Sequence, residues 1–182
     1  MKKWLWTPFV YVAGKKALVL GWLVMGVTAC LSFFSRTHFD GVLDVHVGMS
    51  RPLPLYFLEQ FISWSSAVLL FYLVGRVSSD SSIRSIDVAG TLALSRWPMI
   101  FVSLISFGFP HNLDIRHIDP VWVLLSLLEV AFVVWMVALM YNAFTVSCNL
   151  KGGKATRVFI LALMLSEILS KILFYLIYKP VL

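Results

Sequence analysis

Five long apolar stretches, separated by short polar segments, dominate the pattern of hydrophobic and polar positions along this chain. A helix needs roughly 20 apolar residues to cross ~30 Å of hydrocarbon. None of the stretches alternates between apolar and polar positions as a barrel strand would, and a helix satisfies its own backbone hydrogen bonds in lipid. The pattern therefore predicts an all-α polytopic integral membrane protein, a single membrane domain over residues 1–182 with five transmembrane helices at about 17–35, 55–75, 88–109, 120–146 and 157–178.

The third apolar stretch is interrupted by Pro98, which directly follows Arg96 and Trp97. Proline lacks the N–H that a helix interior needs, and its ring clashes with the preceding turn. We therefore expect a kink at this point, or a break between an interfacial helix at about 83–95 and a shorter span.

Composition places the chain in the membrane class and gives it an orientation. Only 13% of the residues are charged, against about 25% in soluble domains, and the mean hydropathy is +0.88. Lys and Arg accumulate in the segments on the side of the amino terminus, and cytoplasmic loops carry such an excess. With five crossings, this predicts the amino terminus inside and the carboxyl terminus outside. The opposite side carries only Arg36, Arg51, Arg116 and Lys179.

The net charge of +6 is then explained by the basic residues of the cytoplasmic segments, which are attracted to anionic lipid. The sequence has neither a basic stripe interleaved with base-stacking aromatic residues nor a nucleic-acid-binding motif. We expect membrane lipid as a partner and no nucleic acid.

Four ionisable residues inside the apolar stretches are candidate ligand-binding residues: Glu59, Glu129, Glu167 and Lys171. A charge in hydrocarbon costs at least ~2.5 kcal/mol on insertion scales, so such residues tend to be paired or functional. Glu167 and Lys171 are four residues apart, which favours an ion pair on one helix face. The group predicts either a substrate or proton site or a structural polar lock between helices.

Arg96 lies a few residues inside the predicted cytoplasmic boundary. A long basic side chain at that depth reaches lipid phosphates easily. We therefore expect Arg96 to contact lipid headgroups, with ligand binding as the alternative.

All four histidines fall in the two predicted outer loops, together with acidic residues. Imidazole and carboxylate groups can bind zinc or a similar divalent ion, although outer loops are also where polar residues are tolerated. The candidate metal ligands are His38, His46, His111 and His117, whose spacing matches no established ligand pattern. No H-E-x-x-H or G-x-S-x-G motif occurs, so we expect no catalytic residues and no cofactor.

Small residues recur every four positions in the fifth stretch, at Ala162, Ser166 and Ser170. Such stripes let helices approach closely. The stripe predicts packing within the chain or, as the alternative, a face for homo-oligomers.

The whole pattern resembles the Yip family of five-span membrane proteins. The resemblance rests on five spans, on the segment from Gly90 to Trp97-Pro98, and on a Trp-containing fourth span joined by a short turn to Lys154-Ala155. It implies a membrane scaffold, since eukaryotic members organise transport membranes and contact small GTPases. This chain lacks their long amino-terminal region and is more similar to the compact prokaryotic members, which implies a bacterial cytoplasmic membrane.

Three functions follow as hypotheses. The first is a non-enzymatic scaffold that presents a cytoplasmic surface to lipid or to an unknown protein partner. The alternative is a small transporter or permeation pathway that uses Glu129, Glu167 and Lys171. A second alternative is a metal-dependent membrane protein that uses the histidines of the outer loops.

Overall fold

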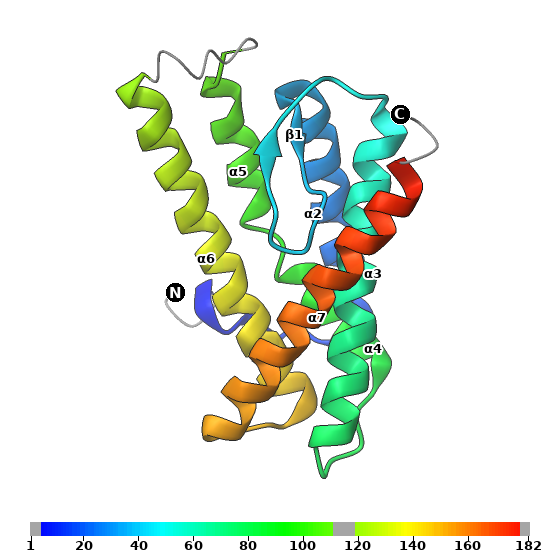
Figure 1. Ribbon diagram of the computed structural model, residues 1–182. Helices are drawn as coiled ribbons and strands as arrows, with labels where there is room; N and C mark the ends of the chain where they lie inside the picture. Colours follow the sequence, from blue (N-terminus) through cyan, green and yellow to red (C-terminus); the bar gives the residue numbers. More distant parts are fainter. Residues whose placement is uncertain (1–4, 111–118, 179–182) are drawn as a thin grey trace.

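The computed structural model describes residues 5–110 and 119–178 and shows an elongated helical bundle (Figure 1). Within these residues, five helical stretches are long and apolar enough to cross a membrane, which confirms the all-α prediction with five candidate spans. The elements are η1 (Pro8–Val10), α2 (Gly14–Ser35), β1 (Thr37–His38), β2 (His46–Val47), α3 (Leu53–Ser78), α4 (Ser85–Leu94), α5 (Met99–Ile105), η2 (Ser106–Gly108), α6 (Pro120–Cys148) and α7 (Gly152–Tyr178).

The third candidate span is broken in the middle. Helix α4 ends at Leu94 and α5 begins at Met99, and the turn between them contains Pro98. The break expected at this proline is therefore confirmed. This span is also the most enclosed, with 61% of its apolar window buried against 17% for α6.

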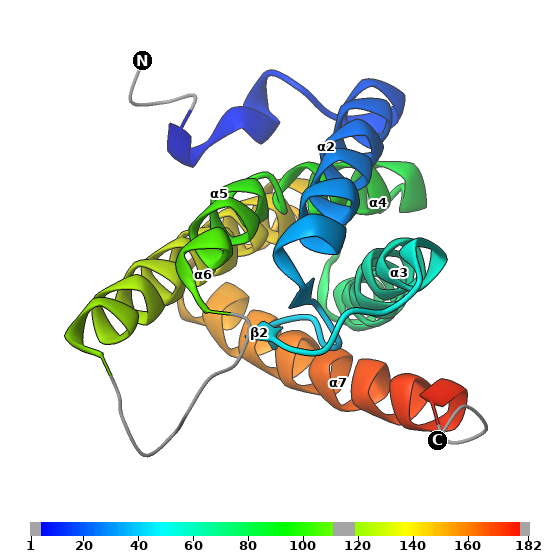
Figure 2. The ribbon, with the colours of Figure 1, turned by 90° about the horizontal axis from the view of Figure 1, so that it is seen from above.

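Close helix approach holds α4 against α2. A Cβ added at Gly21 on α2 would lie 2.5 Å from the backbone of Ala93 on α4, and a Cβ at Gly90 would overlap the carbonyl oxygen of Gly14. Figure 2 shows α2 crossing directly over α4 in the view from above. Only glycine leaves room for backbones this close.

The segment after α2 folds back into the bundle as a short hairpin, which we call the re-entrant hairpin (residues 37–47). Arg36 ends α2 in the left-handed region at φ 58°, and β1 then pairs antiparallel with β2, with His38 opposite His46. Figure 1 shows the hairpin returning along α2, and Figure 2 shows it among α2, α3 and α7. Its tip is part of the core, because Phe39 and Val42 are each only 1% exposed.

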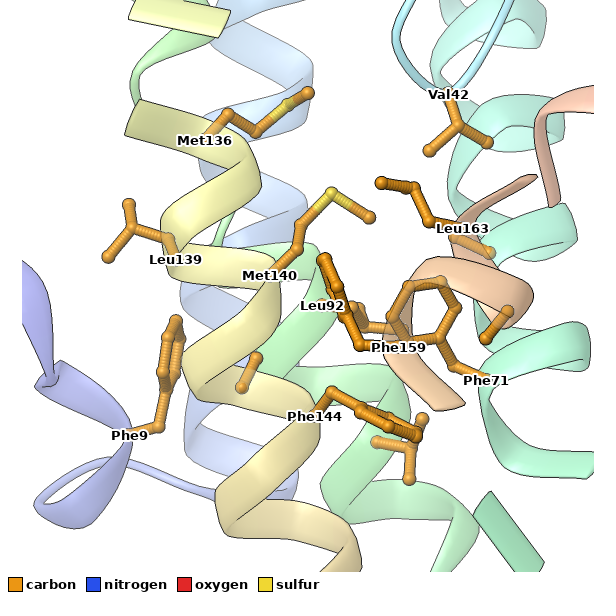
Figure 3. Close-up of a cluster of buried hydrophobic side chains, with 14 of the residues drawn as sticks. Phe9, Val42, Phe71, Leu92, Met136, Leu139, Met140, Phe144, Phe159 and Leu163 are labelled. Carbon is orange, nitrogen blue, oxygen red and sulfur yellow. The ribbon is translucent and has the colours of Figure 1, made fainter. Parts of the chain in front are cut away.

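The apolar core lies below the hairpin, toward the middle of the bundle (Figure 3). Phe71 of α3 contacts Phe144 of α6 and Phe159 of α7 in edge-to-face geometry, at centroid distances of 5.2 and 5.6 Å. Val42 of the hairpin belongs to the same cluster. A loop that contributes core side chains is fixed by packing as well as by polar contacts.

Candidate functional site

The re-entrant hairpin and the helices that hold it form the candidate functional site. Glu59 of α3 is the first anchor: its Oε2 accepts a hydrogen bond from the Phe39 backbone N–H at 3.0 Å. Its Oε1 lies 2.8 Å from His38 Nδ1 and accepts from the Tyr178 hydroxyl at 2.7 Å. His38 Nε2 lies 2.9 Å from the Met49 carbonyl oxygen. Both ring nitrogens of His38 are therefore engaged by groups of the protein itself.

Glu167 of α7 is the second anchor. Its Oε2 accepts a hydrogen bond from the Leu43 backbone N–H at 2.9 Å. Gly41 at the tip lies so close that an added Cβ would overlap Glu167 Oε1. The Glu167 carboxylate thus packs directly against the hairpin backbone, where a side chain at position 41 would not fit, and this explains why glycine suits that position.

Lys171 is the third anchor, and here the structure corrects the sequence prediction. Its ammonium contacts Asp44 and lies 3.3 Å from Asp40 Oδ1, both on the hairpin. The ion pair expected between Lys171 and Glu167 does not appear among the described residues. Two hairpin carboxylates compete for one ammonium, whereas Glu167 is satisfied by a backbone N–H, so the local i, i+4 spacing does not decide the pairing.

Glu129 of α6 lies apart from these anchors. Its Oε1 accepts a hydrogen bond from the Ser106 hydroxyl at 2.7 Å. It lines a cavity of about 450 Å³, whereas Glu59 lines a different cavity of about 240 Å³. The structure therefore brings Glu59, Glu167 and Lys171 together around the hairpin and leaves Glu129 outside that group.

Arg96 is buried, and the prediction that it contacts lipid headgroups is wrong for this structure. Its side chain lies in the turn between α4 and α5, where the residue is 3% exposed, and Nε donates to Gln60 Oε1 at 3.3 Å. Arg96 Nη2 and Gln60 Nε2 have no hydrogen-bond partner among the described residues. The break at Pro98 turns this residue toward the interior of the bundle, and the sequence position alone does not show that.

The histidines divide into two groups. His111 and His117 lie outside the described residues. His38 and His46 stack with ring centroids 5.4 Å apart, but their environments differ, because His38 is buried and His46 is exposed.

His46 belongs to the set of described side chains that could hold a metal ion. Its donor atom and those of Asp40 and Asp44 lie within 4.8 Å of one another. Sequence reasoning named only the histidines as metal ligands, although the Asp40-Gly41 turn signal was a clue that the acidic residues would face back toward His46. The ammonium of Lys171 now lies against the two carboxylates.

The charges of this group shift each other's ionisation. Burial by itself raises the pKa of the Asp40 carboxyl, but the hydrogen bond and charge of His46, together with the charge of Lys171, outweigh it and lower that pKa from 3.8 to about 2. The hydrogen bond to Asp40 raises the pKa of His46 above its usual 6.5, against the opposing effect of burial. The hairpin therefore favours a charged pair of His46 and Asp40.

The smaller cavity is polar and lies between the hairpin, α3 and the end of α7. Its walls include His38, Asp40, His46, Arg51 and Tyr178 in addition to Glu59. The guanidinium of Arg51 lies over the Tyr178 ring at 5.0 Å from the centroid. The arrangement suits the anchoring of the hairpin more than nucleophilic chemistry, since Glu59 already accepts hydrogen bonds and Asp40 pairs with Lys171. Comparisons with family models, with curated proteins and with solved structures gave no match, so what the site does is inferred from its geometry.

Proposed function

We propose that this chain is a non-enzymatic, multi-pass scaffold protein of the Yip type in a bacterial cytoplasmic membrane. One observation carries the proposal. Glu59, Glu167 and Lys171, the ionisable residues of α3 and α7 that could have formed a transport site, each hold the protein's own hairpin. Intramembrane charges used in this way stabilise helix packing rather than a permeation pathway.

The separation of Glu129 supports the same interpretation. A pathway that used Glu129, Glu167 and Lys171 would need these groups along one cavity. Neither Glu167 nor Lys171 is among the described residues that line the cavity of Glu129, and Lys171 pairs with hairpin acids. A substrate would have to displace the hairpin before it met all of these charges.

The end of the bundle opposite the hairpin is the proposed partner surface. In the proposed orientation, with the amino terminus inside and the carboxyl terminus outside, this end is cytoplasmic. It presents exposed polar and basic side chains in the turns between α3 and α4 and between α6 and α7 and at the adjoining helix ends: Arg76, Ser81, Ser82, Arg84, Lys151 and Lys154. Such a surface suits anionic lipid or an acidic face of a protein.

Site-specific photo-crosslinking in cells tests the scaffold role. A photoreactive residue at Arg84 on the proposed cytoplasmic end should give a discrete protein adduct, and the same residue at Met49 on the hairpin end should not. Purified protein in proteoliposomes should show no ion or solute flux that depends on Glu167. A flux abolished by Glu167→Gln, without an adduct at Arg84, would instead establish the transporter.

A metal-dependent role is the second candidate, favoured by the proximity of Asp40, Asp44 and His46. A divalent ion at this position has to displace the ammonium of Lys171. Addition of zinc to metal-free protein should then raise the unfolding temperature, and His46→Ala should remove that rise while His38→Ala leaves the response to zinc intact. An unchanged unfolding temperature in the wild type excludes this candidate for zinc.

A further inference from the structure

We propose that the cleft between the re-entrant hairpin and α6 binds a membrane lipid whose headgroup ends in an ammonium. The cleft has a volume of about 450 Å³, and its two walls come from residues 43–47 of the hairpin and from α6 between Ser126 and Val134. The inference rests on the membrane insertion proposed above but not on the scaffold role.

The two walls of the cleft differ in chemistry. The hairpin side carries Asp44 and His46, whereas the α6 side carries Val130, Val133 and Val134, with Glu129 among them. A ligand that satisfies both walls needs a polar group at one end and an apolar body at the other. Lipids have this character, and small soluble ions or sugars do not.

The cleft is accessible from the apolar side of the bundle. Val130 and Val134 line it and are nevertheless 58% and 61% exposed. Helix α6 is also the candidate span that the rest of the protein covers least, with 17% of its apolar window buried. In Figure 1 the half of α6 at the hairpin end stands away from α7. In a bilayer, acyl chains cover this face and can enter the cleft sideways.

Charge selects the headgroup. The described residues that line the cleft include the acidic Asp44 and Glu129 but no lysine or arginine, and the imidazole of His46 in its wall is paired with Asp40. Asp44 is already paired with Lys171, whereas the described hydrogen-bond partner of Glu129 is the neutral hydroxyl of Ser106. An ammonium offers the half-buried carboxylate an opposite charge and several N–H donors, and a headgroup without a cation offers neither.

The depth of Glu129 fits a lipid rather than a soluble amine. Glu129 is nine residues beyond Pro120, the first residue of α6, which places it about 14 Å along the helix from that end at 1.5 Å per residue. A carboxylate at that depth lies within reach of the hydrocarbon boundary, where an unpaired charge is costly. The hairpin descends beside it and supplies a polar wall at the same level.

Lipid retention measures the preference directly. Purified protein is equilibrated in detergent with equal amounts of phosphatidylethanolamine and phosphatidylglycerol of identical chains, and native mass spectrometry counts the lipid retained. We expect phosphatidylethanolamine to be enriched about threefold to tenfold, the range that a partly buried ammonium–carboxylate contact provides. Glu129→Gln should bring the ratio close to one, and Asp80→Asn, which removes an exposed acid at the opposite end, should leave the enrichment unchanged.

A second variant tests the cleft even if Glu129→Gln fails to fold. Val134→Trp retains every charge and fills the apolar wall, so it should reduce the retention of both lipids together. Equal retention of the two lipids by the wild type overturns the proposal, as does an enrichment that survives in folded Glu129→Gln protein. If the enrichment of phosphatidylethanolamine depends on Glu129 but no protein adduct forms at Arg84, the lipid-binding proposal is supported and only the scaffold role is contradicted.

Discussion

Lys171, near the end of α7, contacts Asp44 of the re-entrant hairpin across 127 residues of sequence. Asp40 Oδ1 lies 3.3 Å from the same ammonium. One lysine thus ties both flanks of the hairpin tip to the last helix. The contact is partly open to the surroundings, because the Lys171 and Asp44 side chains are 40% and 43% exposed.

Loss of this contact should weaken the protein only modestly. Partly exposed ion pairs contribute roughly 0.2–1 kcal/mol, so we expect Lys171→Met to lower the free energy of unfolding by that amount and Lys171→Arg to retain most of it. Unfolding in mixed micelles at increasing sodium dodecyl sulfate, followed by circular dichroism, provides the measurement. A loss of several kcal/mol would show that screening is far weaker than the exposure of these side chains indicates.

Glu59→Gln should cost more, although it preserves the shape of the side chain. The carboxylate accepts from the Phe39 N–H and the Tyr178 hydroxyl and contacts His38. An amide must turn its own NH₂ toward one of these donors, which leaves a buried donor without an acceptor at about 1–3 kcal/mol. Glu129→Gln is the matched control, since its described partner is one hydroxyl. Equal effects of the two substitutions in the same unfolding assay would contradict the anchoring role of Glu59.

The approach of α2 to α4 predicts opposite results for two glycines of α2. Gly21→Ala places a methyl group 2.5 Å from the Ala93 backbone, and such overpacking costs about 1–3 kcal/mol. Gly26→Ala lies on the same helix with no atom within 4 Å of the new Cβ. Alanine there should be neutral or stabilising by up to about 1 kcal/mol through helix propensity. Thermal unfolding of both variants checks the pair, and a stable Gly21→Ala protein would show that the helices lie further apart.

The Asp40–His46 pair predicts how stability depends on pH. The lowered pKa of Asp40 adds stability above pH 3.8 that is lost as the pH falls toward about 2. The raised pKa of His46 adds stability below pH 6.5 that is lost as the pH rises through the folded value. Asp44, Glu59 and Lys171 also face this pair. The contribution of the pair is therefore largest between about pH 4 and 6.5.

We expect the wild type to be more stable at pH 5.5 than at pH 8.5, and His46→Gln to reduce that difference. Because the His46 side chain is 48% exposed, the effect should remain below about 1 kcal/mol. Unfolding curves at the two pH values, recorded for both proteins in one detergent, measure it. A pH dependence that is identical in the two proteins would place the titrating group elsewhere.

The bundle itself could be predicted from the sequence. Five apolar stretches of the right length determine the spans because each helix must satisfy its own backbone in lipid. The break near Pro98 was also predictable, since a proline in the interior of an apolar stretch interrupts or kinks the helix. Both signals are local and do not depend on which helix becomes the neighbour.

The hairpin could not be predicted in the same way. Phe39 and Val42 appear in the sequence as two apolar residues in a polar loop, and their burial depends on a space that α3, α6 and α7 leave open. The pairing of Lys171 with Asp40 and Asp44 likewise forms only because the hairpin folds back into the bundle. Arg96 illustrates the same limit. Its position along the apolar stretch is compatible with a headgroup contact, and only the turn between α4 and α5 directs its side chain toward Gln60.

Thiol labelling tests most directly whether the hairpin is seated inside the bundle. In a protein whose exposed Cys30 and buried Cys148 are replaced by alanine, single cysteines are placed at Val42, which is 1% exposed, and at Met49, which is 80% exposed. A maleimide added to the detergent-purified protein, where both ends of the bundle are accessible, should label Met49→Cys rapidly and Val42→Cys only after denaturation. Equal labelling of both positions in the folded protein would contradict a buried hairpin, and with it the structural role assigned here to Glu59, Glu167 and Lys171.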